Sequence, residues 1–252
     1  MNLSDQQKER YLRNIILPEI GENGQEKLLN SKILVIGAGG LGSSAILYLA
    51  AAGIGNITII DDDSVELSNL QRQIIHNFKD LNKVKVQSAA EKITLLNKDV
   101  SVKTHQLRIN KDNLSNFVKN HDFILDCSDN FPTRFIINEI CFLMQKPLVF
   151  AAVKGFLGQV SVFKPYLKNN PCYCCFNPNI VKEGFELPLS QKGIIGAVAG
   201  TIGSLQATTA IKEILEIGES LVGKILIFDL LQNNIRKVNL NKNINCQICK
   251  LQ

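Results

Sequence analysis

The sequence contains no internal repeat and no low-complexity tract, and its 17 glycines and 7 prolines are ordinary counts for 252 residues. These absences exclude collagen-like and low-complexity proteins. Intrinsic disorder is excluded too, because hydrophobic residues make up 45% of the chain and charged residues only 20%, which is enough apolar surface for a buried core. The length predicts one large domain, or one domain with a small appendage.

Two further absences bear on location and partners. Residues 1–8 contain no apolar stretch, so a signal peptide is not expected. A net charge of +5, from 28 basic and 23 acidic residues, permits an acidic partner but falls short of the clustered charge of a nucleic-acid-binding protein. We therefore expect a cytoplasmic protein, in a reducing compartment, that binds neither nucleic acid nor a membrane.

The seven cysteines are an odd number in a chain too long for a small disulfide-stapled protein. Two Cys-x-x-Cys pairs occur, Cys172 with Cys175 and Cys246 with Cys249. Their four thiolates could complete a tetrahedral, structural Zn²⁺ site if the fold brings the pairs together; the alternative is two unrelated redox or incidental pairs. The other three are predicted to be an ambiguous extra ligand, Cys174, and two buried structural thiols, Cys127 and Cys141.

Apolar runs and helical spacing alternate along the first 155 residues. After a short charged helix capped by Ser4 and ending near Arg13, strands are expected at 32–36, 57–60, 100–107, 123–125 and 148–153, and helices at 43–52, 84–96 and 133–144. Strands that are apolar throughout and alternate with helices predict a parallel, doubly wound sheet. Beyond residue 155 we expect an antiparallel strand at 160–163, a long loop at 164–192, a helix at 193–217, and strands at 224–228 and 235–239.

The predicted fold class is therefore α/β, with a doubly wound, mostly parallel Rossmann-like sheet, a C-terminal antiparallel extension and a four-cysteine zinc site. The segment 193–217 leaves one alternative open, because about 20 apolar residues suffice to span a membrane. Polar residues such as Thr201 and Ser204 interrupt the run, and Lys212 and Glu213 continue it. A buried helix whose small residues allow close packing is the favoured interpretation.

A glycine turn, Gly37-x-Gly39-x-x-Gly42, follows the first strand and precedes a helix. In this context the first glycine makes the turn, the second lets the backbone approach a phosphate, and the third lets helix and strand pack closely. The helix N-terminus offers free N–H groups to an anion. Asp61, at the end of the next strand, is placed to bind a ribose. The turn predicts a nucleotide site without choosing between NAD, FAD and ATP.

Further charged and polar side chains follow the glycine turn. Asp61-Asp62-Asp63 supplies more carboxylates than a dinucleotide enzyme needs, and a polar stretch with Asn69 and Arg72 follows. Lys85 begins the next predicted helix, and Asp129 follows the predicted strand at 123–125. Basic residues near a helix N-terminus can hold a triphosphate, and an aspartate can hold Mg²⁺ against its oxygens. Singly, each has an ordinary alternative: a surface lysine, a helix cap at Asp126 or Asp129, or a polar loop brace. Together they favour nucleotide triphosphate chemistry over hydride transfer.

A set of motifs occurs in order along the chain: Arg10-Tyr11-Leu12-Arg13-Asn14-Ile15-Ile16-Leu17, the glycine turn, Ser68-Asn69-Leu70-Gln71-Arg72-Gln73, Lys85, Asp126-Cys127-Ser128-Asp129-Asn130 and the two Cys-x-x-Cys pairs. In combination they closely resemble the MoeB/ThiF/HesA family of ubiquitin-activating-type adenylyltransferases, over about residues 9–249. The resemblance is nearest to the molybdopterin-synthase type. It implies ATP, Mg²⁺ and structural Zn²⁺, and as partner a small ubiquitin-like sulfur-carrier protein that ends in Gly-Gly.

The resemblance also implies a reaction and a set of residues. The carboxylate of the carrier tail would attack the α-phosphate, giving an acyl-adenylate and pyrophosphate. The nucleotide-binding residues that it implies are Gly37, Gly39, Gly40, Leu41, Gly42, Asp61, Asp63, Asn69, Arg72, Gln73, Lys85, Asp129 and Asn130. Among these, Asp61 would hold the ribose, Asn69, Arg72 and Lys85 the phosphates, and Asp129 the Mg²⁺. The catalytic set that it implies is Arg13, Arg72, Lys85 and Asp129, with Arg13 reaching into the ATP site of the partner protomer.

The family forms homodimers, to whose interface the helix 193–213 would contribute, and has a crossover loop, here 177–192, over which the carrier tail passes. Thiamine-type members carry a cysteine in this loop that links covalently to the carrier. The stretch Leu187-Pro188-Leu189-Ser190-Gln191-Lys192 has none. This favours the molybdopterin-type reaction, which stops at the adenylate and serves molybdenum cofactor biosynthesis. The sequence ends near Cys249, so we expect no appended rhodanese domain and, as sulfur source, a separate persulfide donor.

We therefore expect a single adenylation domain over 1–252, with N-terminal helices in 1–30, a nucleotide-binding Rossmann-like part in 31–155 and a carrier-binding part in 156–252. Three alternatives remain open. The same chemistry could serve the sulfur carrier of the thiamine thiazole. An NAD- or FAD-dependent oxidoreductase would explain the glycine turn but leave the later charged residues idle. A non-catalytic, zinc-stabilised binding module would not explain why the charged set is present.

Overall fold

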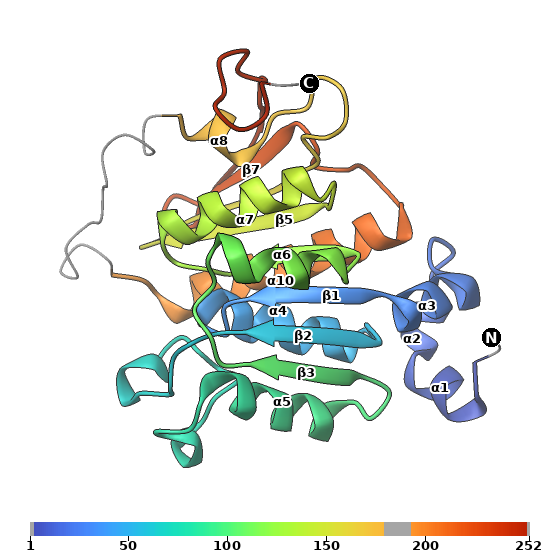
Figure 1. The fold of residues 1–252 in the computed structure, drawn as a ribbon. Coiled ribbons are helices and arrows are strands. Elements are labelled where there is room, and N and C mark those ends of the chain that lie inside the picture. Colours follow the sequence, from blue (N-terminus) through green and yellow to red (C-terminus); the bar gives the residue numbers. More distant parts are fainter. Residues whose placement is uncertain (1–2, 179–192, 251–252) are drawn as a thin grey trace.

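The computed structural model describes residues 3–178 and 193–250 of the chain. An eight-stranded sheet runs through it, and its strands are ordered β3-β2-β1-β4-β5-β6-β7-β8 (Figure 1). The strands are β1 (Lys32–Ile36), β2 (Asn56–Ile60), β3 (Ser101–His105), β4 (Phe123–Asp126), β5 (Leu148–Lys154), β6 (Leu157–Phe163), β7 (Lys224–Asp229) and β8 (Asn234–Asn239).

Strands β1 to β5 pair in parallel, and β6, β7 and β8 extend the sheet with antiparallel pairs. The order 3-2-1-4-5 is that of a doubly wound nucleotide-binding fold. The predicted α/β fold with a mostly parallel sheet and an antiparallel C-terminal extension is therefore confirmed. Strand β6 begins three residues before the predicted strand, because residues 157–159 already pair with β5 in an antiparallel hairpin. The pairing begins with Leu157 opposite Lys154.

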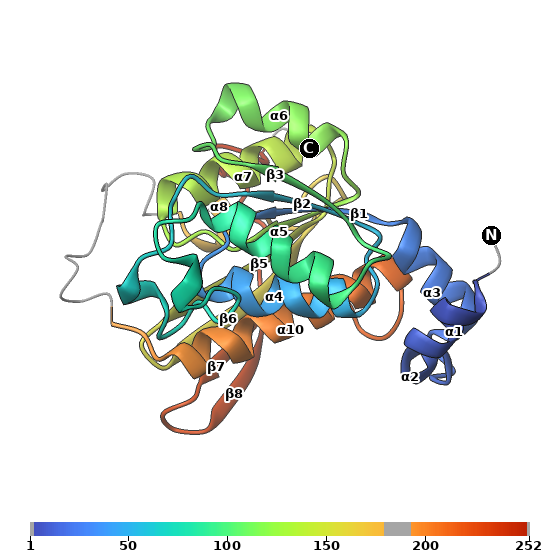
Figure 2. The same ribbon diagram turned by 90° about the horizontal axis from the view of Figure 1, so that it is seen from below.

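Helices cover both faces of the sheet, as Figure 2 shows, with α6 and α7 on one face and α4, α5 and α10 on the other. Side chains of β1 point alternately to the two sides, so that Ile33 and Val35 join one buried cluster while Leu34 and Ile36 join the other. The helices that supply these clusters are α4 (Gly40–Ala51), α5 (Lys85–Leu96), α6 (Lys111–Lys119), α7 (Phe131–Leu143) and α10 (Gly196–Leu215).

Helix α10 packs closely against α4. A Cβ at Gly203 would collide with the Leu41 carbonyl and the Ser44 hydroxyl, so only glycine lets the two backbones approach this far. Further along α10, the buried Gln206 amide donates to the Asp126 carbonyl at 2.8 Å and the Val149 carbonyl at 3.0 Å, which ties the helix to β4 and β5. Neither α10 nor any other helix in the described part of the chain is both long and apolar enough to span a bilayer.

Three short helices precede the sheet: α1 (Asp5–Arg10), α2 (Leu12–Ile15) and α3 (Gly21–Asn30). The predicted cap is confirmed, because the Ser4 hydroxyl accepts from the Gln7 N–H at 3.2 Å. Helix α1 ends at Arg10 rather than near Arg13, which lies in α2. Short helices also occur at η1 (Leu67–Asn69), η2 (Phe78–Asp80) and α8 (Tyr173–Phe176). Most of the expected crossover loop 177–192 lies outside the described residues.

Candidate functional site

The glycine turn joins β1 to α4, and its three glycines have three different environments. Gly37 has φ +102°, and a Cβ there would lie 2.7 Å from the Cys127 carbonyl oxygen. At Gly42 a Cβ would collide with the Gly37 carbonyl. At Gly39 it would meet nothing closer than the Gln73 amide nitrogen at 3.8 Å. The packed first and third glycines and the open second one are the arrangement predicted for a turn that receives a phosphate at the start of α4.

Asp61 directly follows β2 and binds the glycine turn. Its carboxylate accepts the Ala38 N–H at 2.7 Å through one oxygen and the Asp63 N–H at 2.9 Å through the other. Burial raises the pKa of Asp61 above its usual value of 3.8, whereas the positive charge of Lys85 and the two backbone donors oppose this shift. The carboxylate is thus fixed beside the turn, with lone pairs left on both oxygens.

Lys85 is the first residue of α5, and its side chain is 6% exposed. Its ammonium group lies 2.7 Å from a carboxylate oxygen of Asp63, and its backbone N–H donates to the Asp63 carbonyl at 3.0 Å. Two contacts to one residue hold the start of α5 against the segment that follows Asp61. Lys85 is therefore not the solvated surface lysine of the ordinary alternative, because it is a buried cation near the glycine turn.

The segment between β2 and α5 places Arg72 and Gln73 on the glycine turn. A Cβ at Gly40 would lie 3.6 Å from the Arg72 Cγ, and the Gln73 amide faces Gly39. Gln73 is buried, and its carbonyl oxygen has no hydrogen-bond partner among the described residues. Asn69, also buried, accepts the Glu66 N–H at 3.2 Å and so braces its own turn. The Arg72 guanidinium donates to the Ser68 carbonyl at 3.0 Å.

The loop after β4 brings Asp129 to the same edge of the sheet, because the first glycine of the turn packs on the Cys127 carbonyl. Asp129 is exposed, and its carboxylate accepts a long hydrogen bond from the Asn130 side-chain amide at 3.4 Å. Asn130 is the N-cap of α7, where its oxygen accepts the Thr133 N–H at 3.0 Å. Neither Asp126 nor Asp129 is therefore the cap of this helix, and the Asp129 carboxylate is free of that role.

Beneath this loop lies a buried polar cluster that the sequence did not reveal. The Arg134 guanidinium donates to the Ser128 carbonyl at 2.9 Å, and the fully buried Asp126 accepts the Ser128 N–H at 2.9 Å. Burial raises the pKa of Asp126, and the charge of Arg134 opposes this shift. The arginine also lies over the Phe150 ring, 5.5 Å from its centre. The conformation of the Asp129 loop is thus set from inside the protein.

Arg13 does not lie at this edge. In Figure 1, α1 and α2 lie beside the ends of the strands opposite to the arrowheads, whereas the glycine turn follows an arrowhead. The neighbouring Tyr11 hydroxyl contacts Asp99 at 3.0 Å and Asn97 at 2.8 Å, just beyond the C-terminal end of α5. Arg13 is exposed. Within one chain, therefore, the structure does not bring Arg13 together with the other predicted site residues.

The two Cys-x-x-Cys pairs meet, although about 70 residues separate them in the sequence. Sulfur–sulfur distances are 3.9 Å for Cys172 and Cys175, 3.6 Å for Cys172 and Cys246, and 3.4 Å for Cys175 and Cys249. A tetrahedral Zn²⁺ with Zn–S bonds of about 2.3 Å would hold its sulfurs about 3.8 Å apart, so the donor set fits this metal. Cys174 is buried beside the four but is not one of them.

The other two cysteines are buried, as predicted. The Cys127 thiol donates to the Gln206 side-chain oxygen at 3.2 Å, under the glycine turn, and Cys141 lies in the core on α7. Burial raises the pKa of both thiols well above the usual range. Both are consequently protonated and unreactive at neutral pH.

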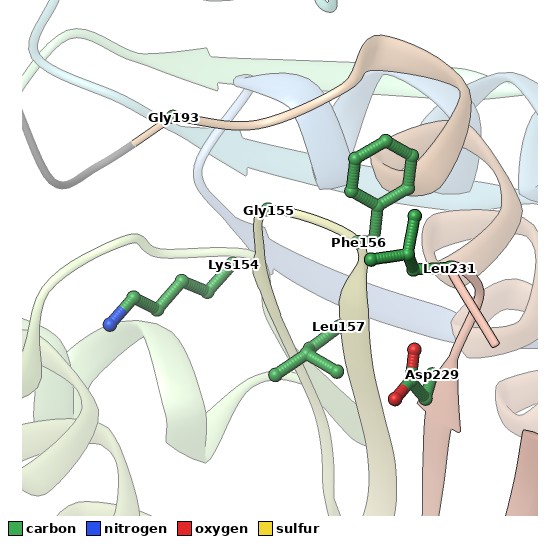
Figure 3. A pocket seen from close by; sticks show the side chains of 7 residues that line it. All are labelled: Lys154, Gly155, Phe156, Leu157, Gly193, Asp229 and Leu231. Atoms are coloured by element: carbon green, nitrogen blue, oxygen red, sulfur yellow. The ribbon is translucent and has the colours of Figure 1, made fainter.

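A groove of about 400 Å³ opens between the β5–β6 and β7–β8 turns (Figure 3). Phe156, Leu157 and Leu231 give it an apolar lining, and Lys154 and Asp229 add one charge of each sign. Gly193, where the described chain resumes after residue 178, also lines it, and its carbonyl accepts the Gly155 N–H at 2.9 Å. The groove therefore adjoins the C-terminal end of the expected crossover loop.

His76 was not predicted from the sequence as a site residue. This buried histidine lies between the carbonyl of Ala38, in the glycine turn, and the hydroxyl of Ser88, on α5. The only signal in the sequence was a polar residue after the apolar pair Ile74-Ile75. A lone histidine beside apolar residues does not by itself distinguish a site residue from a core residue, so the role of His76 emerges only from its partners.

Comparison with known proteins places the chain among relatives along nearly its whole length. The SAMP-activating enzyme E1 of Haloferax volcanii is 41% identical over 249 residues, which cover 99% of this chain and 91% of that protein. The sulfur carrier protein adenylyltransferase of Thermus thermophilus is 37% identical over 252 residues, which cover 99% and 93%. The crystal structure of Escherichia coli MccB with ATP superposes with a TM-score of 0.81 at 26% identity, over 96% of this chain and 74% of that one. Residues 11–248 match the ThiF family, and the chain belongs to it.

Proposed function

We propose that this protein is an ATP-dependent adenylyltransferase that activates the C-terminal glycine of a small ubiquitin-like sulfur carrier. Membership of the ThiF family and the names of the two relatives, a SAMP-activating enzyme and a sulfur carrier protein adenylyltransferase, support this activity. The observation that carries it is the convergence on one glycine turn of Asp61, Lys85, Arg72 and the Asp129 loop. A dehydrogenase would have no use for the buried cation and the second carboxylate.

In the proposed reaction, a carboxylate oxygen of the carrier's terminal glycine attacks the α-phosphorus of ATP. A new oxygen–phosphorus bond forms, the bond to the β-phosphate oxygen breaks, and pyrophosphate leaves with the electron pair. The N-terminus of α4 at Gly39 and the cations of Lys85 and Arg72 would stabilise the negative charge on the phosphates. The lone pairs of Asp61 left by the backbone would accept ribose hydroxyls.

Asp129 would hold Mg²⁺. Its side chain is exposed and almost unpaired beside the glycine turn, and a carboxylate is the ligand that Mg²⁺ takes alongside substrate phosphates. When bound, the ion neutralises phosphate charge in the transition state. Gly37, Gly40, Leu41, Gly42, Asp63, Asn69, Gln73 and Asn130 would form the rest of the nucleotide pocket. Of these, Asn69 would act mainly by bracing the loop that carries Arg72.

Arg13 would act on the ATP of a partner protomer in a homodimer. Its exposure and its distance from the glycine turn of its own chain support an action in trans. Exposed apolar side chains flank it, Leu12 at 52%, Ile16 at 58% and Leu17 at 46%, a surface suited to burial against a second copy. Such a dimer would complete each ATP site with a guanidinium from the other subunit.

The four clustered cysteines would hold a structural Zn²⁺. The fit of their separations to tetrahedral geometry supports this, and with four protein ligands no position remains open for chemistry. The metal would fix residues 246–249 to the base of the segment that follows β6. It would thereby stabilise the C-terminal part of the proposed single domain, 156–252, to which we assign carrier binding.

The carrier tail would approach along the apolar groove at Phe156 and Leu231, because this groove adjoins the end of the expected crossover loop 177–192. The absence of cysteine from residues 187–192 supports a reaction that ends at the adenylate, as in molybdenum cofactor biosynthesis, over a covalent intermediate of the thiamine type. The pathway is therefore proposed to be that of molybdopterin.

An isotope-exchange assay tests the proposed activity. The purified protein with MgATP, radiolabelled pyrophosphate and a Gly-Gly-terminated carrier is expected to return label to ATP. The matched control is the same carrier without its two terminal glycines, which should give no exchange. Absence of exchange with every small carrier of the source cell would refute the proposal.

A further inference from the structure

His76 connects three elements of the candidate site. It follows the segment that carries Arg72 and Gln73, and it is 5% exposed. Its Nε2 lies 3.1 Å from the Ala38 carbonyl oxygen in the glycine turn, and its Nδ1 lies 2.8 Å from the Ser88 hydroxyl on α5. Ser88 is one helical turn after Lys85. The imidazole thus bridges the glycine turn and the helix whose first residue is the buried cation.

The bonding pattern defines the proton position on the ring. A carbonyl oxygen can only accept, so Nε2 carries the hydrogen and donates it to Ala38. In a neutral ring Nδ1 is then an acceptor, and it faces the Ser88 hydroxyl, which also lies within hydrogen-bond reach of the Asp80 carboxylate. Burial favours this neutral ring, because it lowers the pKa of His76 below the usual value of 6.5.

Ala38 is held from both sides. Its N–H is bound by Asp61 and its carbonyl by His76, and its two chain neighbours are Gly37 and Gly39. Glycines leave the adjoining peptide groups free to rotate unless something else holds them. Because a peptide group is planar, the bond from His76 to the Ala38 carbonyl also restrains the Gly39 N–H of the same peptide, and Gly39 is the glycine of the turn with the open environment.

We propose that His76 is a positioning residue for the nucleotide: it fixes the Ala38–Gly39 peptide in the orientation that receives a phosphate and aligns α5 with it. This inference rests on the proposed function, because it assumes that the glycine turn binds ATP. A preorganised donor binds without first having to be ordered, so loss of the His76 bond should weaken ATP binding beyond any loss of stability.

A second buried histidine provides a matched control. His121 also bridges one carbonyl and one hydroxyl, Phe117 at 2.6 Å and Thr58 at 2.7 Å, and it is 9% exposed. Thr58 lies in the middle of β2 and Phe117 lies on α6, so neither of these two hydrogen bonds involves the glycine turn. Substitutions at His121 should lower stability in the same way and leave ATP binding unchanged.

The test compares His76→Gln, His76→Asn and His76→Leu with His121→Gln and His121→Leu. The Gln amide nitrogen can occupy the place of Nε2 and restore the donor to Ala38, whereas Asn reaches only the place of Nδ1. MgATP affinity is measured by isothermal titration calorimetry and stability by thermal unfolding. We expect His76→Leu and His76→Asn to weaken ATP binding about tenfold and His76→Gln by no more than about threefold.

Ser88→Ala keeps the imidazole and removes the hydroxyl that contacts its Nδ1, a hydroxyl that also interacts with Asp80. This variant carries the test if His76→Leu does not fold, and we expect it to weaken ATP binding about two- to fivefold. Wild-type affinity in His76→Leu, or an equal loss in His121→Leu, would overturn the inference. If the wild-type protein itself does not bind MgATP, the proposed function is wrong. If the wild-type protein binds MgATP and His76→Leu binds it equally well, only the inference about His76 is wrong.

Discussion

Lys85 and Asp63 form an ion pair of 2.7 Å in which the cation is buried and the anion is not: 6% of the lysine side chain is exposed, against 65% of the aspartate side chain. The two partners therefore differ in what their removal leaves behind. Without the lysine, the carboxylate is solvated by water. Without the carboxylate, a buried ammonium group loses its hydrogen-bond acceptor. An unpaired buried cation lowers the free energy of unfolding more than the loss of an exposed ion pair does.

From this asymmetry we expect Asp63→Asn to lower the free energy of unfolding by about 1–3 kcal/mol and Lys85→Met to lower it by less. Activity should rank in the opposite way. Lys85→Met removes a cation from the phosphates, so pyrophosphate exchange should fall by at least about a hundredfold. Urea unfolding and the exchange assay provide the two measurements. A larger stability loss in Lys85→Met than in Asp63→Asn would contradict the structural basis of this prediction.

Asp129→Ala is expected to abolish pyrophosphate exchange and leave the melting temperature unchanged. The side chain is exposed and makes one weak contact, with Asn130, so its removal leaves no buried group unpaired. Asp112→Ala, which removes an exposed carboxylate from α6 on another part of the surface, is the matched control and should retain activity. Substantial exchange by the Asp129 variant would remove this residue from the site.

Arg13→Ala should be inactive alone and regain activity when mixed with Asp129→Ala. In a mixed dimer, one of the two sites has both an intact Asp129 and an intact Arg13 from the partner. Random reassembly of equal amounts would give about a quarter of the wild-type activity, since half the dimers are mixed and each has one working site. Subunit exchange without any recovered activity would refute action in trans.

Elemental analysis should find one zinc per chain in the wild-type protein. Cys249→Ser should lose the metal, because it removes one of the four clustered sulfurs, and should melt at a lower temperature. Cys174→Ala, which removes a buried cysteine outside the four-sulfur cluster, should retain it. A metal-free wild-type protein with an unchanged fold would rule out the four-thiolate zinc site.

Acid should destabilise the protein through its buried histidines. Burial lowers the pKa of His76 and of His121 below 6.5, so below that pH the unfolded chain binds protons that the folded chain does not. Around His76, Lys85 and Lys92 act in the same direction and Asp80 opposes them. The stabilisation that comes from keeping His76 and His121 neutral is fully present above pH 6.5. It is lost as the pH falls through the pKa values of these two histidines in the folded protein.

The measurement is the melting temperature between about pH 7.5 and 5.5 for the wild type and for a double variant, His76→Gln with His121→Gln. The glutamines do not titrate in this range, so the double variant should show a smaller drop over the interval. Its comparison with the wild type isolates the histidine contribution from that of buried carboxylates. Parallel curves would show that the two histidines titrate normally.

Local patterns in the sequence predicted much of the fold and part of the site. The apolar strands and the glycine spacing depend on neighbours in the chain, so β1, β2, β4 and β5 were placed to within a few residues. The turn at Gly37–Gly42 was predicted with a separate role for each glycine, and the crowded Gly37 and Gly42 and the open Gly39 agree with these roles, whereas phosphate binding stays a prediction. The two cysteine pairs were recognisable from their spacing, whereas only the fold could bring them together.

What escaped prediction depends on partners far along the chain or on weak local signals. Helix α6 has three apolar side chains at helical spacing, Leu114, Phe117 and Val118, but they span only about five positions, a stretch too short to distinguish a helix from a loop. Helix α4 begins at Gly40, three residues before the predicted start at Ser43. The start was misplaced because no capping side chain marks it in the sequence. The contact between His76 and Ala38 spans 38 positions, and no short pattern records it.

The most direct test of the account is mass spectrometry of the carrier. The protein is incubated with MgATP and each small Gly-Gly-terminated carrier of the source cell, and the intact carrier is weighed. We predict that one carrier gains the mass of a single adenylyl group at its C-terminal glycine, and that Asp129→Ala gives none. If every carrier keeps its original mass while the protein is folded and MgATP is present, the central claim that this chain adenylates a sulfur carrier is wrong.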